Sequence, residues 1–400
     1  MADFSVPSPT AGGLRTLTGI SIAHWISHLH MLVLPLLFPI LKDQLGVDYV
    51  ALGFALTIFG VVSAVTQAPI GYLVDHLGAR TILLAGILLG GSALVLLGLS
   101  VSYGSLLACS ALLGLANATY HPADYAILAA HMDEARMGRA FSIHSFSGFA
   151  GAAMAPAIVH TLTTSLGSNN ALIGCGLLAI VIALVLALLR IPDAAARKEG
   201  SAGDGGTKPR IVTTTLIVLT VFFLLLSLSS TGITSFGLVA LTRGFGVSDV
   251  SANTALSAYL ATTAIGVLAG GVLADWTTHH GQVAAFCFAV NAVIVIVIAL
   301  VPLSAPLLIL LLALAGFLSG IIAPSRDMLV RNAAPPGATG RAFGIVSTGF
   351  NFGAILGPPL FGWIMDNNAP HWLFGASAIF MLATVALSFF TEPPRVVKES

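Results

Sequence analysis

The sequence predicts an all-α membrane protein in which twelve helices cross the bilayer as two pseudo-symmetric bundles of six. The first observation is composition: of 400 residues, 57% are hydrophobic and only 8% are Asp, Glu, Lys or Arg, against roughly 25% charged residues in soluble domains. The second is a series of twelve long apolar stretches. The third is a repeat of sequence motifs at half the chain length. With so few charges to face water, the chain needs lipid as a second solvent.

Each apolar stretch can cross the hydrocarbon core as a helix, which takes about 20 residues. Six helices are expected in the first half, near residues 14–41, 48–74, 79–99, 104–130, 139–163 and 169–190. Six more are expected near residues 211–241, 250–274, 282–302, 305–330, 341–365 and 370–390. Polar, Gly-rich residues between the two sets predict a flexible linker. The expected parts are an N-terminal bundle over 1–190, a cytoplasmic linker over 191–210 and a C-terminal bundle over 211–400.

Basic residues are distributed unevenly between alternate loops. If the N-terminus is cytoplasmic, all 16 Lys and Arg residues except Lys42 and Arg243 fall in cytoplasmic segments. Positive charge is retained on the cytoplasmic side during insertion. Both termini are therefore expected on the cytoplasmic side of a bacterial-type inner membrane. The N-terminal segment has one basic residue, Arg15, at the start of the first apolar stretch, and no small-residue cleavage site follows. This stretch is therefore expected to be a retained helix.

Several function classes are excluded by composition and motifs. The 16 basic and 16 acidic residues balance, which gives no sign of nucleic-acid binding. The chain has no Gly-Lys-Ser/Thr phosphate loop, so ATP is not the expected energy source and no enzyme activity is expected. The three cysteines, Cys109, Cys175 and Cys287, lie in apolar stretches without metal-ligand spacing and are expected to pack as small hydrophobic residues.

The two halves of the chain repeat one another. The segment from Gly71 to Asp75 returns 200 positions later, and the segment 138–141 returns 202 positions later. Continuing the second alignment without gaps matches further small or helix-breaking residues: Gly114 with Gly316, Pro122 with Pro324, Gly151 with Gly353, and Pro156 with Pro358. Parallel repeats of six helices are an architecture of secondary transporters, which bind substrate between the repeats near mid-membrane.

The run Gly71-Tyr-Leu-Val-Asp75-His-Leu-Gly78-Ala-Arg80 resembles the signature loop of the major facilitator superfamily, and the resemblance extends over the whole chain. Glycines permit a tight turn there, and the charged residues can pair with other charges or helix ends. In that superfamily the loop gates the inner opening. The resemblance therefore implies gating roles for Gly71, Asp75, Gly78, Arg80, Gly271 and Asp275.

Two short motifs resemble the fosmidomycin-resistance type of drug exporter. One is the His-rich first helix that leads into Leu34-Pro-Leu-Leu37, and the other is Tyr120-His-Pro-Ala-Asp124. The Gly and Pro motif that marks drug/proton antiporters in the fifth helix is incomplete here, because no Gly directly precedes Pro156. The resemblance implies export, whereas the incomplete motif leaves import open.

Ionisable residues inside spanning helices are costly and indicate function. His24 and His28 share one face of the first helix because they are four residues apart, and His121 and Asp124 lie one turn apart in the fourth. In the superfamily the first, fourth, seventh and tenth helices line the cavity, which implies that the four residues converge. Because His titrates near neutrality, a His–Asp pair can bind and release a proton as the cavity alternates. The alternatives are packing contacts, a hydrogen bond that steadies the helix around Pro122, or a transition-metal site.

The second half of the chain has a basic residue at the position that corresponds to Asp124. Arg326 stands 202 positions after Asp124 and is followed by Asp327. A guanidinium binds carboxylate or phosphonate groups through paired hydrogen bonds, so Arg326 is a candidate substrate ligand; alternatively, it anchors the cytoplasmic end of its helix. His144 and Asn351 are further candidate substrate contacts.

The sequence therefore predicts a monomeric, proton-coupled secondary transporter that works by alternating access. Its expected cargo is a small drug-like, anionic or zwitterionic metabolite that is exported, and it is expected to use the proton gradient without a cofactor. The alternatives are a proton symporter that imports an organic acid, a transporter of a transition metal or metal chelate, and a membrane sensor that transports nothing.

Overall fold

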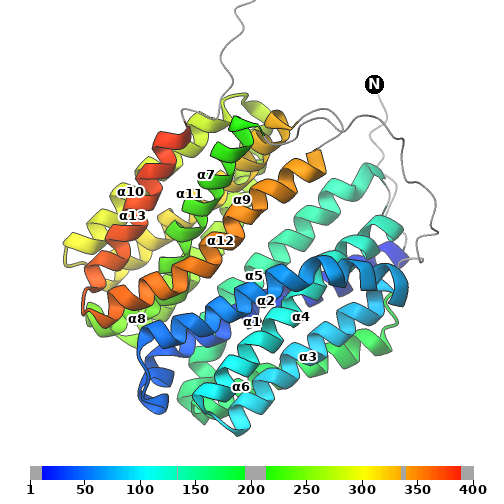
Figure 1. Ribbon diagram of the computed structural model, residues 1–400, viewed down its shortest axis with the longest axis horizontal. Coiled ribbons are helices and arrows are strands. Elements are labelled where there is room, and N and C mark those ends of the chain that lie inside the picture. The colour runs from blue at the N-terminus through cyan, green and yellow to red at the C-terminus, as the bar shows by residue number, and fades with distance from the viewer. Residues whose placement is uncertain (1–10, 133, 194–212, 335–338, 389–400) are drawn as a thin grey trace, which may run out of the picture.

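The computed structural model describes residues 11–132, 134–193, 213–334 and 339–388 (Figure 1). Within these ranges the chain forms helices joined by short turns, and it has no strand. Most of the predicted linker lies outside the described residues, which omit 194–212.

The helices match the expected spans within a few residues and confirm the two-bundle architecture. The first bundle contains α1 (Ala11–Leu45), α2 (Tyr49–Leu77), α3 (Ala79–Leu99), α4 (Tyr103–His131), α5 (Glu134–Leu166) and α6 (Ser168–Leu188). The second begins with one long helix made of α7 (Thr214–Thr231), the π-helical turn η1 (Gly232–Phe236), α8 (Gly237–Val239) and the π-helical turn η2 (Ala240–Gly244). It continues with α9 (Asp249–Trp276), α10 (His280–Leu300), α11 (Ala305–Ala333), α12 (Thr339–Asp366) and α13 (Pro370–Ser388).

Ten of these helices are long and apolar enough to cross a membrane by length and composition. The chain is therefore a multi-pass membrane protein. The two long helices that do not meet this test are α4 and α12. Helix α4 carries the intramembrane residues His121 and Asp124, which explains its lower apolar content.

The sequence repeat corresponds to a repeat of helix crossings. Helices α4 and α11 are both 29 residues long and begin 202 positions apart. A Cβ at Gly114 of α4 would meet the backbone of Phe59 in α2, and a Cβ at Gly316 of α11 would meet the backbone of Tyr259 in α9. The matched glycines therefore sit where two helix backbones touch, which only a residue without a side chain permits.

A second pair of crossings repeats in the same way. Gly151 of α5 lies against the carbonyl oxygen of Trp25 in α1, and Gly353 of α12 lies against Ser227 in α7. Because α1 and α5 carry three of the ionisable residues singled out above, the Gly151 contact helps to set their spacing.

The signature segment is mostly helical, which corrects the expectation of a loop. Gly71 and Asp75 belong to α2, Gly271 and Asp275 belong to α9, and only Gly78 separates α2 from α3. Gly78 has a φ of 90°, a backbone conformation that glycine adopts without strain. A Cβ at Gly71 or Gly271 would meet nothing within 4 Å, so no close contact requires glycine there.

The turn after α2 is fastened to the end of α6. The guanidinium of Arg80 donates to the carbonyl oxygen of Ala187 at 2.9 Å, and the backbone N–H of Arg80 donates to Oδ1 of Asp193 at 3.0 Å. Asp193 thus caps the N-terminus of α3, where Gly78 has no side chain to do so. The expected pairing of Arg80 with a helix end is confirmed, whereas Asp75 is exposed and has no partner among the described contacts.

Replacing Asp193 by Ala is expected to lower the free energy of unfolding by about 1 kcal/mol, the usual value of a helix cap. Asp75→Ala is the matched control, because Asp75 is exposed near the negative C-terminal end of α2 and its removal should be neutral or slightly stabilising. Thermal unfolding of the detergent-solubilised variants measures both. Equal destabilisation by the two changes would contradict the capping role.

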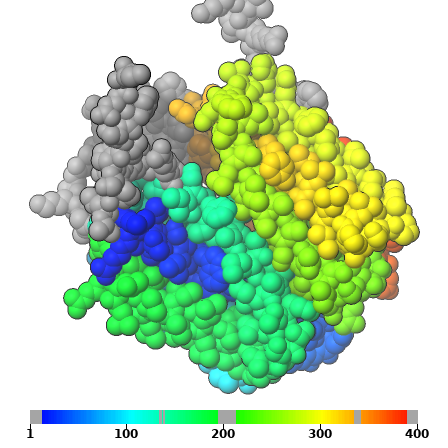
Figure 2. All heavy atoms as spheres, turned by 180° about the vertical axis from the view of Figure 1, so that it is seen from behind, coloured from blue at the N-terminus to red at the C-terminus, as the bar shows by residue number. Residues whose placement is uncertain are grey.

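The bundles contact one another unequally along their length. Helix α2 packs against α12 on one face and α5 packs against α9 on the other, as Figure 2 shows for the latter pair. Among the described residues, the hydrogen bonds between bundles involve α1, α2 and α5 on one side and η2, α9 and α12 on the other. They all lie toward the end where α1 stops and α2 starts, which we call the closed end. At the opposite end, where α1 begins and α13 stops, the bundles diverge (Figure 1).

Candidate functional site

Three helices of the first bundle bring five ionisable side chains together. Helix α1 supplies His24 and His28, α4 supplies His121 and Asp124, and α5 supplies His144. We call these five residues the His–Asp cluster. The convergence of the first four agrees with the sequence prediction, and His144, predicted only as a substrate contact, joins them.

Asp124 is the centre of the cluster. Its side chain is fully buried, and neither carboxylate oxygen has a hydrogen bond in the described structure. Its Oδ2 lies 3.7 Å from Nδ1 of His24 and 3.6 Å from Nε2 of His144. These distances lie just beyond hydrogen-bond length, so a small movement of either ring would form a direct bond to the carboxylate.

The imidazole rings of the cluster pack against one another. Nε2 of His24 is hydrogen-bonded to Nε2 of His28 at 3.0 Å. The ring centroid of His24 lies 3.9 Å from that of His144 and 5.3 Å from that of His121. A Cβ at Gly148 of α5 would collide with the ring of His24. The glycine therefore makes room for the histidines, a role that the sequence did not reveal.

The same atoms could act as metal ligands. One ligand nitrogen from each of His24, His121 and His144 lies within 4.8 Å of the others. Ligands of one tetrahedral zinc ion stand roughly 3.3 Å apart, since Zn–N bonds are about 2.0 Å long. The rings would have to close in to hold such an ion.

Tyr125 lies beside the cluster, and it was missed in the sequence because a tyrosine next to Asp124 is unremarkable in an apolar helix. Its side chain is 43% exposed, and its ring centroid lies 5.5 Å from that of His121 and 5.8 Å from that of His144. Its ring therefore packs against the cluster from a partly exposed position.

Arg326 lies on α11 of the second bundle. Its Nε donates to Oδ1 of Asp327 at 3.2 Å, and its guanidinium carbon lies 5.2 Å from the ring centroid of Phe223 and 5.8 Å from that of Phe350. The side chain is 24% exposed. Arg326 is seven residues before the end of α11, so it lies about 10 Å inside the helix end rather than at it. Asn351 is exposed on α12 and makes no hydrogen bond among the described contacts.

His30, the three cysteines and Pro122 lie outside the cluster and pack within the helices of the protein. His30 is buried and lies against Gly90 of α3. The three cysteines are buried and unpaired, in agreement with their expected packing role. Pro122 lies within α4, which stays helical on both sides of it.

The arrangement of the helices in two bundles of six agrees with the sequence match. The model of the Major Facilitator Superfamily matches residues 20–242 and 220–400. The chain belongs to this superfamily. It is accordingly a transporter and not an enzyme.

Relatives within the superfamily include bacterial transporters. The chain is 26% identical over 292 residues to the fosmidomycin resistance protein of Escherichia coli strain K12, covering 69% of this chain and 71% of that protein. It is 32% identical over 156 residues to the uncharacterized MFS-type transporter YfnC of Bacillus subtilis strain 168, covering 38% and 37%.

Solved structures of the superfamily have the same fold. A bacterial homologue of the human lysosomal transporter Spinster, in an inward-facing and occupied conformation, matches with a TM-score of 0.79 at 15% identity, covering 96% of this chain and 97% of that one. The inward-facing and unoccupied form of such a homologue matches with a TM-score of 0.75 at 17% identity, covering 96% of both chains.

Proposed function

We propose that this superfamily member is a proton-coupled secondary transporter that exports a small anionic or zwitterionic molecule by alternating access. The His–Asp cluster binds the coupling proton, and Arg326 of the second bundle binds the acidic group of the cargo. The end at which the bundles diverge faces the cytoplasm, as the distribution of basic residues favours. Both termini then lie on the cytoplasmic side of a bacterial-type inner membrane.

The observation that carries this proposal is the environment of Asp124. A negative charge that is fully buried without a hydrogen bond costs several kcal/mol unless a proton or a cation balances it. The described ionisable groups within 4 Å of its carboxylate are His24 and His144. A proton on the carboxyl group or on one of these rings balances the charge, and rotation of the bundles that wets the cluster releases it.

The cargo assignment depends on Arg326. One edge of its guanidinium is engaged by Asp327, and the faces of Phe223 and Phe350 lie beside it. A guanidinium has five N–H donors, so donors remain for a carboxylate or phosphonate. The export direction is supported by the relative that confers fosmidomycin resistance in E. coli.

Substrate-dependent proton movement in proteoliposomes tests the proposal. Vesicles with a pH-sensitive dye inside are given an imposed pH gradient, and panels of carboxylated, phosphonated and cationic compounds are added in turn. We expect proton flux with anionic or zwitterionic compounds, running opposite to the compound. Flux in the same direction as the compound would identify a symporter that imports an organic acid. Transport without proton movement would overturn the coupling.

Arg326→Gln is expected to raise the concentration of anionic cargo needed for half-maximal transport by roughly 10- to 100-fold, the factor that corresponds to a lost charged hydrogen bond. Arg326→Lys should restore it in part, because an ammonium keeps the charge but not the planar pair of donors. Arg331→Gln, on an exposed residue of the same helix, is the control. Equal loss in the two Gln variants would show a general effect of charge on α11 instead of binding.

A further inference from the structure

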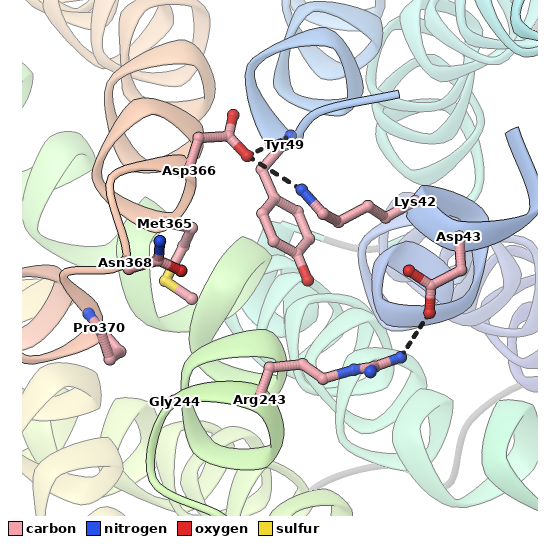
Figure 3. Close-up of a pocket in the computed structure, with 9 residues that line it drawn as sticks. All are labelled: Lys42, Asp43, Tyr49, Arg243, Gly244, Met365, Asp366, Asn368 and Pro370. Carbon is pink, nitrogen blue, oxygen red and sulfur yellow. Dashed lines mark hydrogen bonds and ion pairs between the residues drawn. The ribbon is translucent and has the colours of Figure 1, made fainter. Parts of the chain in front are cut away.

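The closed end is held by a carboxylate of one bundle that binds a helix terminus of the other. Oδ1 of Asp366, the last residue of α12, accepts the backbone N–H of Tyr49 at 2.9 Å, and Oδ2 accepts that of Val50 at 2.9 Å. Nζ of Lys42 donates to the same Oδ1 at 3.2 Å. Figure 3 shows Lys42 and the amide of Tyr49 both directed at Asp366.

These bonds give the first backbone N–H groups of α2 an acceptor in the other bundle. The first turn of a helix leaves backbone N–H groups without intrahelical partners, and it attracts negative charge. Asp48 caps the N–H of Ala51 within the first bundle, whereas the two preceding N–H groups depend on Asp366. Separation of the bundles at this end would leave those two groups and Lys42 without their present partner.

A second cross-bundle ion pair at the same end is more open to water. Nη2 of Arg243 donates to Oδ2 of Asp43 at 2.8 Å, and the two side chains are 55% and 64% exposed. Lys42 and Asp366 are 33% and 18% exposed. Exposed ion pairs contribute little because water and salt screen them. The Arg243 pair is thus the weaker of the two fastenings.

An aromatic contact between the bundles lies beside the polar contacts. The ring centroid of Phe236 in η1 lies 5.3 Å from that of Phe38 in α1 and 6.3 Å from that of Tyr49. All three rings are buried. Phe236 is the last residue of a π-helical turn, a local irregularity that recurs at functional positions in helices.

We propose that the closed end is a two-layer gate in which Asp366 is the principal latch and the rings of Phe38, Phe236 and Tyr49 form the seal. Opening this end requires Asp366 to leave the start of α2 and Phe236 to leave the first bundle. The device is independent of which compound is carried and of whether protons are coupled, because none of its groups belongs to the His–Asp cluster.

Spin-label distances across the closed end test the latch. A background with the three buried cysteines replaced receives labels at two exposed positions, Asn170→Cys in α6 and Thr254→Cys in α9, and is reconstituted in nanodiscs. In Asp366→Asn we expect the ratio of open to closed populations at this end to rise about tenfold or more, because bonds to a charged acceptor are lost. Asp43→Asn, the matched control in the exposed pair, should shift the ratio by less than about threefold.

A second variant keeps the test decisive if Asp366→Asn lowers the yield of folded protein. Lys42→Met removes the cation and leaves both backbone bonds, so a smaller shift in the same direction is expected. Unchanged distances in both variants, with monodisperse protein, would overturn the latch. Equal shifts in Asp43→Asn and Asp366→Asn would also overturn it, because they would show that net charge and not the capped helix start holds this end.

Discussion

Asp124→Asn is expected to abolish substrate-dependent proton flux while leaving the protein folded. Asn has nearly the shape of Asp but cannot carry the charge that makes a proton necessary at this position. Proton movement per transported molecule should fall toward zero, because an amide does not bind and release a proton in this pH range. Any remaining transport should become insensitive to the pH gradient. The free energy of unfolding should stay level or rise, because replacing a buried charge by a neutral group removes its desolvation cost.

Counterflow exchange separates loss of coupling from loss of transport, since exchange of labelled for unlabelled cargo needs no net proton movement. The Asp124→Asn transporter should retain exchange and lose accumulation against a gradient. His30→Gln serves as the matched control, because His30 is a buried histidine of the same helix as His24 but lies against α3. If the Asp124→Asn variant kept full proton coupling, the cluster would not be the site that binds the coupling proton.

The fold was predictable from sequence because its determinants are long-range patterns that need no coordinates. Apolar length fixes a membrane helix, and the repeats place matched glycines at matched crossings, as Gly114 and Gly316 show. The signature segment was less predictable. Gly71 resembles a turn residue but lies inside α2, and the cap for α3 comes from Asp193, more than a hundred residues away in sequence.

The site was predictable in part, for a related physical reason. His24, His28, His121 and Asp124 could be grouped because helical spacing places each pair on one face, and the superfamily implies which helices line the cavity. The inclusion of His144 depends on how α5 is rotated, and that rotation is set by close contacts such as Gly148 against His24. The proton-coupling and substrate-binding roles of all these residues stay predictions until flux is measured.

Gly151→Ala is expected to lower both stability and transport, because its new methyl group would collide with the backbone of Trp25 in α1. Overpacking of this kind costs about 1–3 kcal/mol, and relief requires α1 and α5 to move apart. That movement also separates His24 from His144, so proton coupling should fail along with stability. Thermal unfolding can be followed with a thiol-reactive dye, since the three native cysteines are buried until the bundles open.

The repeat supplies the comparison that separates these two effects. Gly353→Ala meets Ser227 in the equivalent crossing of α12 with α7, so it should lose a similar amount of stability while leaving the His–Asp cluster in place. Gly271→Ala should be neutral or stabilising by about 0.5–1 kcal/mol, because its Cβ meets nothing and Ala favours the helix. Equal stability losses at Gly151 and Gly353, with proton coupling lost only at Gly151, would show that one crossing geometry serves packing in both bundles and positions the ionisable side chains in one. Loss of coupling in both would instead mean that motion of the whole bundle, and not the local spacing of α1 and α5, limits proton transfer.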